Sequence, residues 1–218
     1  MTRGGLLFSG KGVNLPSKQL GLRTLTPKDI NILHLALNNR VDFIGLSFTA
    51  DADDIVRAKR IIKQAGRQTW VIAKIERSQA VKNFEEIIEE ADGAMVARGD
   101  LGVEMGIDSI PLLQKDIIRK ANAAGKPVIT ATQMLESMVN SATPTRAEVT
   151  DIANAIIDGT DAVMLSEETA VGKYPIDAVR VMKRVAAATE KALPYRTLLD
   201  SKRTLVKAIV QEAISFSA

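Results

Sequence analysis

The sequence predicts an α/β fold that is built on a sheet of parallel strands. From about residue 26 onward, short β-rich runs alternate with segments whose apolar residues recur at helical spacing. The strand-like runs are apolar nearly throughout, as expected of strands that are buried on both faces. They span residues 42–48, 69–75, 93–97, 127–131 and 161–165. Serial βα units of this kind predict parallel strands joined by right-handed crossovers.

The helices between these runs have recognisable ends. Residues that favour a helix start precede each helical pattern: Thr26 with Pro27, Asp51 with Asp54, Ser78, Pro111, Thr145 and Pro175. Three of the patterns end at Gly66, Gly125 and Gly159. The pattern that follows Ser78 predicts one helix with Val81, Phe84, Ile87 and Ile88 on its apolar face. The last pattern predicts a buried face made of Val179, Met182, Val185 and Ala186.

The two ends of the chain depart from this βα rhythm. Residues 1–25 are rich in glycine and short hydrophobic residues, which is more typical of a hairpin from another lobe. After Pro194 a polar stretch leads into a helical pattern from about Thr204, and we expect both end segments to belong to units that continue elsewhere. A closed (β/α)₈ barrel has eight strands and about 250 residues. The periodicity therefore leaves two alternatives, an open five-stranded sheet and the later part of a barrel.

Composition excludes several classes of function. The 218 residues are 46% hydrophobic and 25% charged, with a net charge of +3, and only 4% are aromatic, which argues against nucleic-acid binding. Cysteine is absent, so disulfides and thiolate metal sites are excluded and a cytoplasmic location is expected. His34 is the single histidine, which excludes a histidine-based triad or zinc site within the chain. No apolar run approaches the roughly 20 residues of a membrane span. Any metal is expected to be a hard cation with oxygen ligands.

Charged and polar side chains stand where successive strand-like runs end, which is where ligands bind in parallel α/β proteins. Lys74 and Glu76 close the second run, and Asp100 follows the third. Because neighbouring parallel strands end at the same edge, Glu76 and Asp100 could together hold Mg²⁺ or Mn²⁺. Lys74 lies two residues before Glu76, on the same strand face, where its ammonium could meet developing negative charge.

Further candidates stand at the same edge. Gly99 and Gly102 allow backbone N–H groups to approach an anion at a helix start. Thr132 follows the fourth run, and we include as supporting candidates Ser47, Arg98, Gln133, Ser166 and Glu168. Each motif alone also has a structural explanation: Lys74 and Glu76 as an ion pair, residues 99–100 as a turn, and residues 166–169 as an ordinary helix start. Polar groups at four successive strand ends favour a site.

Five runs of this sequence resemble pyruvate kinase, and they occur in that family's order. They are residues 11–16, 71–76, 95–104, 129–138 and 144–149, and the resemblance spans roughly residues 4 to 195. It implies that residues 26–195 form part of a TIM (β/α)₈ barrel, with five βα units that resemble strands four to eight. Residues 1–25 would be the end of the lid domain, and residues 196–218 the start of a C-terminal domain.

The resemblance implies phosphoryl transfer from phosphoenolpyruvate to ADP, giving pyruvate and ATP. Glu76 and Asp100 resemble the ligands of Mg²⁺ (or Mn²⁺), and Lys74 the lysine that stabilises phosphoryl transfer and the enolate. Gly99, Asp100 and Thr132 match positions that hold phosphoenolpyruvate, and Thr132 lies near the protonation step. K⁺ is also implied, but the family's potassium ligands belong to strands that have no counterpart here. The expected partners are the two substrates and further copies of the enzyme, without nucleic acid or membrane.

Two departures from the family bear on nucleotide binding. Glu167 stands where a small residue is usual, and Val171 where a lysine is frequent.

Two alternatives remain open at this point. One is a Mg²⁺-dependent lyase or aldolase of a related barrel, acting on a pyruvate enolate. The other is a chain that only binds and does not catalyse.

Overall fold

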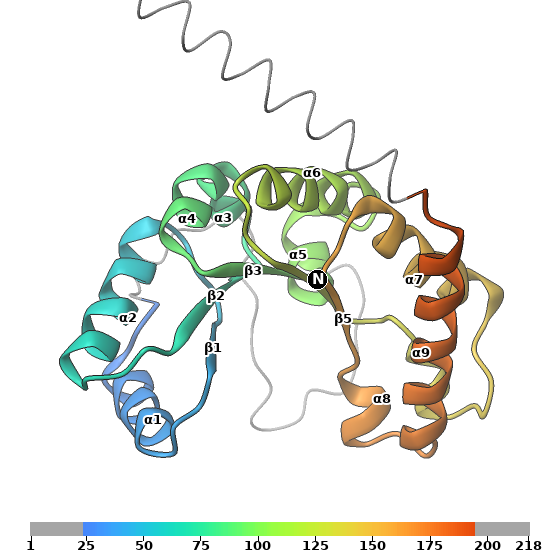
Figure 1. Ribbon diagram of the computed structural model, residues 1–218, viewed down its shortest axis with the longest axis horizontal. Helices are drawn as coiled ribbons and strands as arrows, with labels where there is room; N and C mark the ends of the chain where they lie inside the picture. The colour runs from blue at the N-terminus through green and yellow to red at the C-terminus, as the bar shows by residue number, and fades with distance from the viewer. Residues whose placement is uncertain (1–23, 195–218) are drawn as a thin grey trace, which may run out of the picture.

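The computed structural model describes residues 24–194 (Figure 1). The predicted C-terminal segment, 196–218, and all but the last two residues of the predicted lid segment lie outside the described residues. Within the described range, no helix is both long enough and apolar enough to cross a membrane.

A single parallel sheet organises the described part of the chain. Its strands are β1 (Phe43–Leu46), β2 (Trp70–Ile75), β3 (Gly93–Ala97), β4 (Val128–Ala131) and β5 (Ala162–Met164). Each strand pairs with the next one in the sequence, so that β1 and β5 are the edge strands of the sheet over residues 24–194. The sheet curves into an arch with most helices along its convex side (Figure 1). This confirms the predicted α/β fold and agrees with part of a (β/α)₈ barrel.

The helices lie where the sequence predicts them, with more interruptions. They are α1 (Pro27–Asn38), α2 (Ala52–Gln64), α3 (Ser78–Lys82), α4 (Phe84–Glu90), α5 (Arg98–Met105), α6 (Ile110–Ala123), α7 (Arg146–Asp158), α8 (Glu167–Ala170) and α9 (Pro175–Ala192), with a 3₁₀ turn η1 (Glu136–Val139). Thr26 and Thr145 each form a capping box, with Asp29 and Glu148 respectively. Gly159 ends α7 in the left-handed conformation, with φ of 100°.

Two predictions about helices are wrong. The pattern after Ser78 is two helices, because the chain leaves the helical path at Asn83, whose side-chain amide donates to the Ala50 carbonyl at 3.0 Å. Ser78 does not cap α3, because its hydroxyl instead donates to Glu104 at 3.3 Å.

The buried face of α9 also differs from the prediction. Val179 is 51% exposed, because α9 packs through Ala178, Val181 and Met182. Met182 is therefore correctly predicted, whereas Val179 lies one position away from the packed face.

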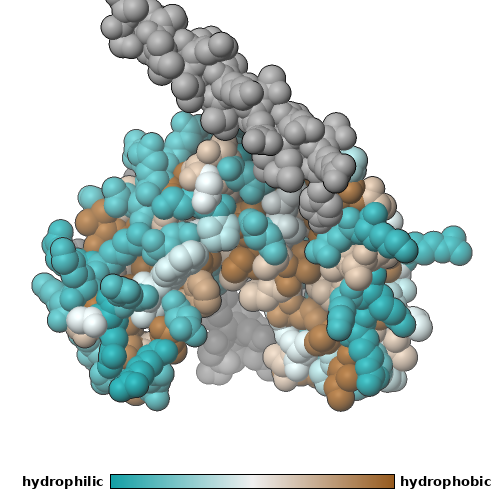
Figure 2. Space-filling view, in the orientation of Figure 1, coloured by the Kyte–Doolittle hydropathy of each residue, from teal (hydrophilic) through white to brown (hydrophobic). Residues whose placement is uncertain are grey.

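The two faces of the sheet have different roles. Val71, Ala73 and Ile75 point toward the helices and join the main hydrophobic core. Residues on the opposite, inner face form a separate apolar cluster: Ile72, Met95 and Ala131, with Ile129 and Met164 against them. Hydrophobic surface is visible along the inner side of the arch in Figure 2. Because successive strand residues alternate between faces, Lys74 and Glu76 share the inner face with Ile72.

Two aspartates hold the strand register at the end of the sheet where strands begin. Asp92 precedes β3, and its carboxylate accepts from the Val71 N–H of β2 at 2.8 Å. Asp161 precedes β5, and its carboxylate accepts from the Val128 N–H of β4 at 2.8 Å. In each case, the carboxylate that precedes one strand accepts a hydrogen bond from the beginning of the neighbouring strand. The register of these strand pairs is therefore set at the end of the sheet opposite the predicted site.

Candidate active site

Lys74 and Glu76 form an ion pair on the inner face of the sheet. The Lys74 ammonium lies 2.6 Å from one carboxylate oxygen of Glu76 and donates to the Ser47 hydroxyl at 2.8 Å. The other Glu76 oxygen accepts from the Phe48 N–H at 2.6 Å. Ser47 and Phe48 follow β1, so two strand ends meet here, and the Lys74 stem passes 3.6 Å from where a Cβ on Gly45 would stand.

The Glu76 carboxylate is a buried negative charge at a strand end. Its side chain is only 2% exposed, whereas that of Lys74 is 25% exposed. A buried carboxylate must be paired or bound to a metal, because desolvation disfavours the charge. Phe48 adopts a left-handed conformation, with φ of 54°, and its N–H donates to Glu76 in that conformation. Main chain and ammonium therefore both stabilise the charge that is predicted to bind the metal.

Asp100 lies in the first turn of α5, directly after β3. Within residues 24–194 its carboxylate accepts no hydrogen bond and forms no ion pair. Among the described residues no side chain caps the start of α5, and the first N–H groups of a helix have no partner inside the helix. The N–H groups of Gly99 and Asp100 are thus available to an anion, and a helix N-terminus favours negative charge. The prediction of a helix start at Gly99 is confirmed, and the structural reading of residues 99–100 as a simple turn is not.

Thr132 and Gln133 form an unusual turn at the end of β4. Both are left-handed, with φ of 75° and 56°, a conformation that β-branched residues rarely adopt. The methyl group of Thr132 would lie 2.9 Å from a Cβ on Gly99, so glycine is needed at residue 99 to let the two strand ends approach.

The main-chain oxygens of this turn accept hydrogen bonds from Arg98. Its guanidinium donates to the Thr132 carbonyl at 3.0 and 2.7 Å and to the Gln133 carbonyl at 3.2 Å. Arg98 therefore faces the protein interior instead of solvent, and the Gln133 side chain is exposed.

Glu168 connects the ends of β4 and β5. It is 1% exposed, and its two carboxylate oxygens accept from the N–H groups of Leu135 at 2.9 Å and of Ser166 at 2.7 Å. Both oxygens are occupied by main-chain donors. The Ser166 side chain makes no capping bond to α8.

The donors present fit a magnesium site completed by substrate. In the described range, no three acidic, histidine or cysteine side chains gather to form a protein-only metal site. Mg²⁺ commonly binds through one or two carboxylates together with substrate oxygens and water. Glu76 and Asp100, at the ends of the paired strands β2 and β3, provide such carboxylates.

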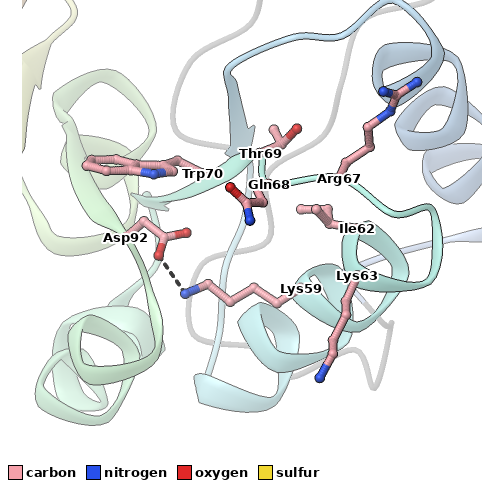
Figure 3. A pocket seen from close by; sticks show the side chains of 8 residues that line it. All are labelled: Lys59, Ile62, Lys63, Arg67, Gln68, Thr69, Trp70 and Asp92. Carbon is pink, nitrogen blue, oxygen red and sulfur yellow. Dashed lines mark hydrogen bonds and ion pairs between the residues drawn. The ribbon is translucent and has the colours of Figure 1, made fainter.

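A hollow at the other end of β2 is separate from these residues (Figure 3). It is lined by Lys59, Ile62, Lys63, Arg67, Gln68, Thr69, Trp70 and Asp92. Lys59 pairs with Asp92 at 2.7 Å, whereas Lys63 and Arg67 point away from the hollow (Figure 3). Trp70 begins β2, whereas Lys74 is near its end and Glu76 follows it, so this hollow lies at the opposite end of the strands from the candidate site.

The loop after the Thr132 turn is held by a carboxylate with a shifted pKa. Burial acts to raise the pKa of Glu148, but hydrogen bonds from Ser137 and Thr145 outweigh it and hold this pKa below the ordinary value of about 4.5. Nearby, burial raises the pKa of Glu136, with smaller contributions from the charges of Glu167, Glu168 and Glu148.

These opposite shifts predict opposite effects of neutralisation. At pH 7, Glu148→Gln should lower the free energy of unfolding by about 1–3 kcal/mol, because charged hydrogen bonds are lost. A lowered pKa stabilises the fold above about pH 4.5 and ceases to do so as pH falls through the folded-state pKa, so the variant's deficit should shrink in acid. Glu136→Gln is the matched control and should not destabilise at pH 7. Urea unfolding followed by circular dichroism from pH 7 to pH 3 measures both; a deficit of Glu148→Gln that is constant with pH would contradict the assignment.

Comparison with known proteins identifies the family of this chain. A family model described as pyruvate kinase, barrel domain, matches residues 1–179. The chain is 50% identical to a pyruvate kinase of Thermococcus litoralis over 222 aligned positions, which cover 98% of the chain and 47% of that protein. The chain belongs to the pyruvate kinase family. It is also 49% identical to pyruvate kinase 2 of Synechocystis over 97% of the chain and 36% of that protein, and 46% identical to the pyruvate kinase of Geobacillus stearothermophilus over 98% of the chain and 37% of that protein.

Family membership confirms the resemblance drawn from five short runs. The chain spans about half or less of the length of these pyruvate kinases. Sequence reasoning missed three groups: the Phe48 N–H on Glu76, and Gln114 and Asp151 beside Arg98. A main-chain N–H is present in almost every residue, so the sequence does not mark the one at Phe48. Gln114 and Asp151 are polar residues in ordinary helical patterns, and nothing in those patterns indicates that they contact Arg98.

Proposed function

We propose that this chain carries the metal- and enolate-binding part of a pyruvate kinase active site. The observation that supports this most is the buried Glu76 carboxylate, paired with Lys74, at a strand end adjacent to that of Asp100. The pyruvate kinases compared above favour this function over the lyase or aldolase alternative, since all three carry the kinase name. Residues 26–195 are proposed as the later barrel units, 1–25 as the end of the lid and 196–218 as the start of a C-terminal domain.

In the proposed reaction, the bond between phosphorus and the enol oxygen of phosphoenolpyruvate breaks. A β-phosphate oxygen of ADP forms the new bond to phosphorus, and C3 of the resulting enolate takes up a proton to give pyruvate. Negative charge moves onto the enolate oxygen, where the Lys74 ammonium stabilises it. The free N–H groups of Gly99 and Asp100 hold the substrate carboxylate. Thr132 is proposed to act near the protonation step.

Glu76 and Asp100 would hold Mg²⁺ or Mn²⁺, which supplies positive charge to the phosphoryl and enolate oxygens. We also propose K⁺ dependence, a homo-oligomeric state and a cytoplasmic location for the complete enzyme. Glu167 and Val171, both exposed, place a negative charge and an apolar side chain where a nucleotide would approach, so ADP is the substrate whose affinity we expect to be weakest.

A hybrid enzyme provides the direct test. In this hybrid enzyme, our chain replaces the matching segment of the Thermococcus litoralis pyruvate kinase. Pyruvate formation from phosphoenolpyruvate should require both ADP and a divalent cation, and it should be stimulated by K⁺. A soluble, folded hybrid that forms no pyruvate would contradict the proposal. Pyruvate formation or exchange without any nucleotide would favour the lyase alternative instead.

The 218-residue chain by itself is expected to transfer little or no phosphate. Over the described residues, β1 and β5 have unpaired edges, and unpaired strand edges favour association. Charge-stabilising groups from the rest of the enzyme would also be missing, and one such group can contribute about 10³–10⁵ in rate. Light scattering and the coupled pyruvate assay on the purified chain measure both effects. Robust ADP-dependent turnover by this chain would contradict the expectation.

A further inference from the structure

Arg98 is the most extensively bonded polar side chain near the candidate site, although the proposed chemistry does not use it. It is 9% exposed and lies between β3, β4, α6 and α7. One nitrogen pairs with the Asp151 carboxylate of α7 at 2.6 Å and also lies 3.3 Å from the Gln114 side-chain oxygen of α6. The other two nitrogens donate to the carbonyls of Thr132 and Gln133. The planar guanidinium is suited to this, because it directs several donors in fixed directions.

The turn that Arg98 contacts is one that the chain would not adopt unaided. Two consecutive residues without the freedom of glycine, Thr132 and Gln133, have positive φ. Such conformations persist only where surrounding contacts hold them, and here the carbonyls that follow the strained φ angles are the acceptors of Arg98. The hydrogen bonds from the Arg98 guanidinium therefore offset the energetic cost of the left-handed conformation of the turn.

Contacts from adjacent residues orient the Thr132 side chain as well. Gly99 leaves room for the Thr132 methyl group, which lies within 2.9 Å of a Cβ position at residue 99. Arg98 thus binds the main chain of Thr132, and Gly99 provides the space that the Thr132 side chain occupies. Asp151 is only partly buried, at 38% exposure, and it faces the guanidinium from the helix side, so it neutralises Arg98 and fixes its direction.

From these contacts we infer that Arg98, held by Asp151, is a positioning residue that sets the left-handed Thr132–Gln133 turn and thereby the place of the Thr132 hydroxyl in the reaction. This inference rests on the proposed function of Thr132. It assigns to Asp151 a role at the site, although Asp151 lies on the outer layer of helices. Lysine at residue 98 would retain the charge opposite Asp151, but its single nitrogen could not reach the acceptors that the guanidinium meets with three separate nitrogens.

A double-mutant cycle in the hybrid enzyme tests this inference. Arg98→Lys should lower kcat by about 10- to 100-fold, the size expected when a reacting group is displaced by roughly 1 Å. The same substitution should lower kcat only about twofold in a Thr132→Ala background, because residues that act through one another are not additive. Deuterium uptake from D₂O into the methyl group of pyruvate, followed by NMR without ADP, should slow in parallel. Asp151→Asn should produce a smaller effect in the same direction, and it provides the cycle if Arg98→Lys does not fold.

Two controls separate this inference from the proposed function. Arg119→Lys alters an exposed pair with Asp116 on α6 and should leave kcat unchanged. Crystal structures of the hybrid enzyme and its Arg98→Lys variant should show Thr132 and Gln133 leaving positive φ, a readout that does not depend on activity. A turn that keeps positive φ without Arg98, or an Arg98→Lys effect of equal size with and without the Thr132 hydroxyl, would overturn the inference while leaving the proposed function intact. An inactive parent hybrid would count against the proposed function alone.

Discussion

Replacing Lys74 with methionine in the hybrid enzyme is expected to lower kcat by about 10³-fold, within the range found when a charge-stabilising group is removed. The KM for phosphoenolpyruvate should change by less than about fivefold, because the ammonium matters most where charge develops in the transition state. In the structure this ammonium lies between the Glu76 carboxylate and the Ser47 hydroxyl. Steady-state kinetics with varied phosphoenolpyruvate at saturating ADP and Mg²⁺ separates the two constants.

This substitution also removes the counter-charge of a buried carboxylate. Breaking a buried ion pair can cost about 3–5 kcal/mol of stability, so unfolding must be measured for each variant. Lys74→Arg is the matched control, since it keeps the positive charge next to Glu76 while changing the shape of the donor. It should retain most of the stability and only part of the activity. A variant whose kcat is intact and whose KM alone rises would make Lys74 a substrate-binding residue.

Asp100→Asn is expected to weaken Mn²⁺ binding by at least about tenfold, since even the loss of a group behind the ligands costs 10- to 100-fold in affinity. Neutralising one of two carboxylates removes half of the protein's negative charge toward the ion. Because the Asp100 carboxylate has no partner within residues 24–194, the substitution should hardly change stability. Calorimetric titration of the hybrid enzyme with Mn²⁺ measures the affinity directly.

Glu104→Gln is the control for Asp100→Asn, since it removes a negative charge from the same helix. Glu104 already accepts a hydrogen bond from the Ser78 hydroxyl at 3.3 Å. Its loss should change Mn²⁺ affinity by less than about twofold, because it would act only as a nearby solvated charge and not as a ligand. Equal effects of the two substitutions would mean that general electrostatics, and not direct ligation by Asp100, controls the affinity.

The strands were the most predictable part of this fold. The run 93–97 matches β3 at both ends, because all five of its residues are buried and no polar residue interrupts it. The run 42–48 is longer than β1, since the strand ends at Leu46, and Ser47 and Phe48 turn away to meet Lys74 and Glu76. Ladder hydrogen bonds end where the site begins, and composition alone does not mark that point.

The length of α5 and the Thr132 turn were not predictable from local patterns. A helix start near Gly99 was predicted, but Gly99 and Gly102 lower helix propensity, so periodicity did not show that the helix continues to Met105. Thr132 is β-branched, and its propensity favours a strand over a left-handed turn. Both features are stabilised by contacts between segments far apart in the sequence, above all those of Arg98, which lies 34 residues before Thr132.

The aspartate anchors at the beginning of the strands have a consequence for how such an enzyme can change. Asp92 and Asp161 pin neighbouring strands at the end of the sheet that lies away from Lys74, Glu76 and Thr132. A loop at the opposite end can therefore gain, lose or exchange residues without shifting the strands that carry it. Divergence in substrate or nucleotide preference would then accumulate in those loops, at positions such as Glu167 and Val171. The register of the strands would stay the same.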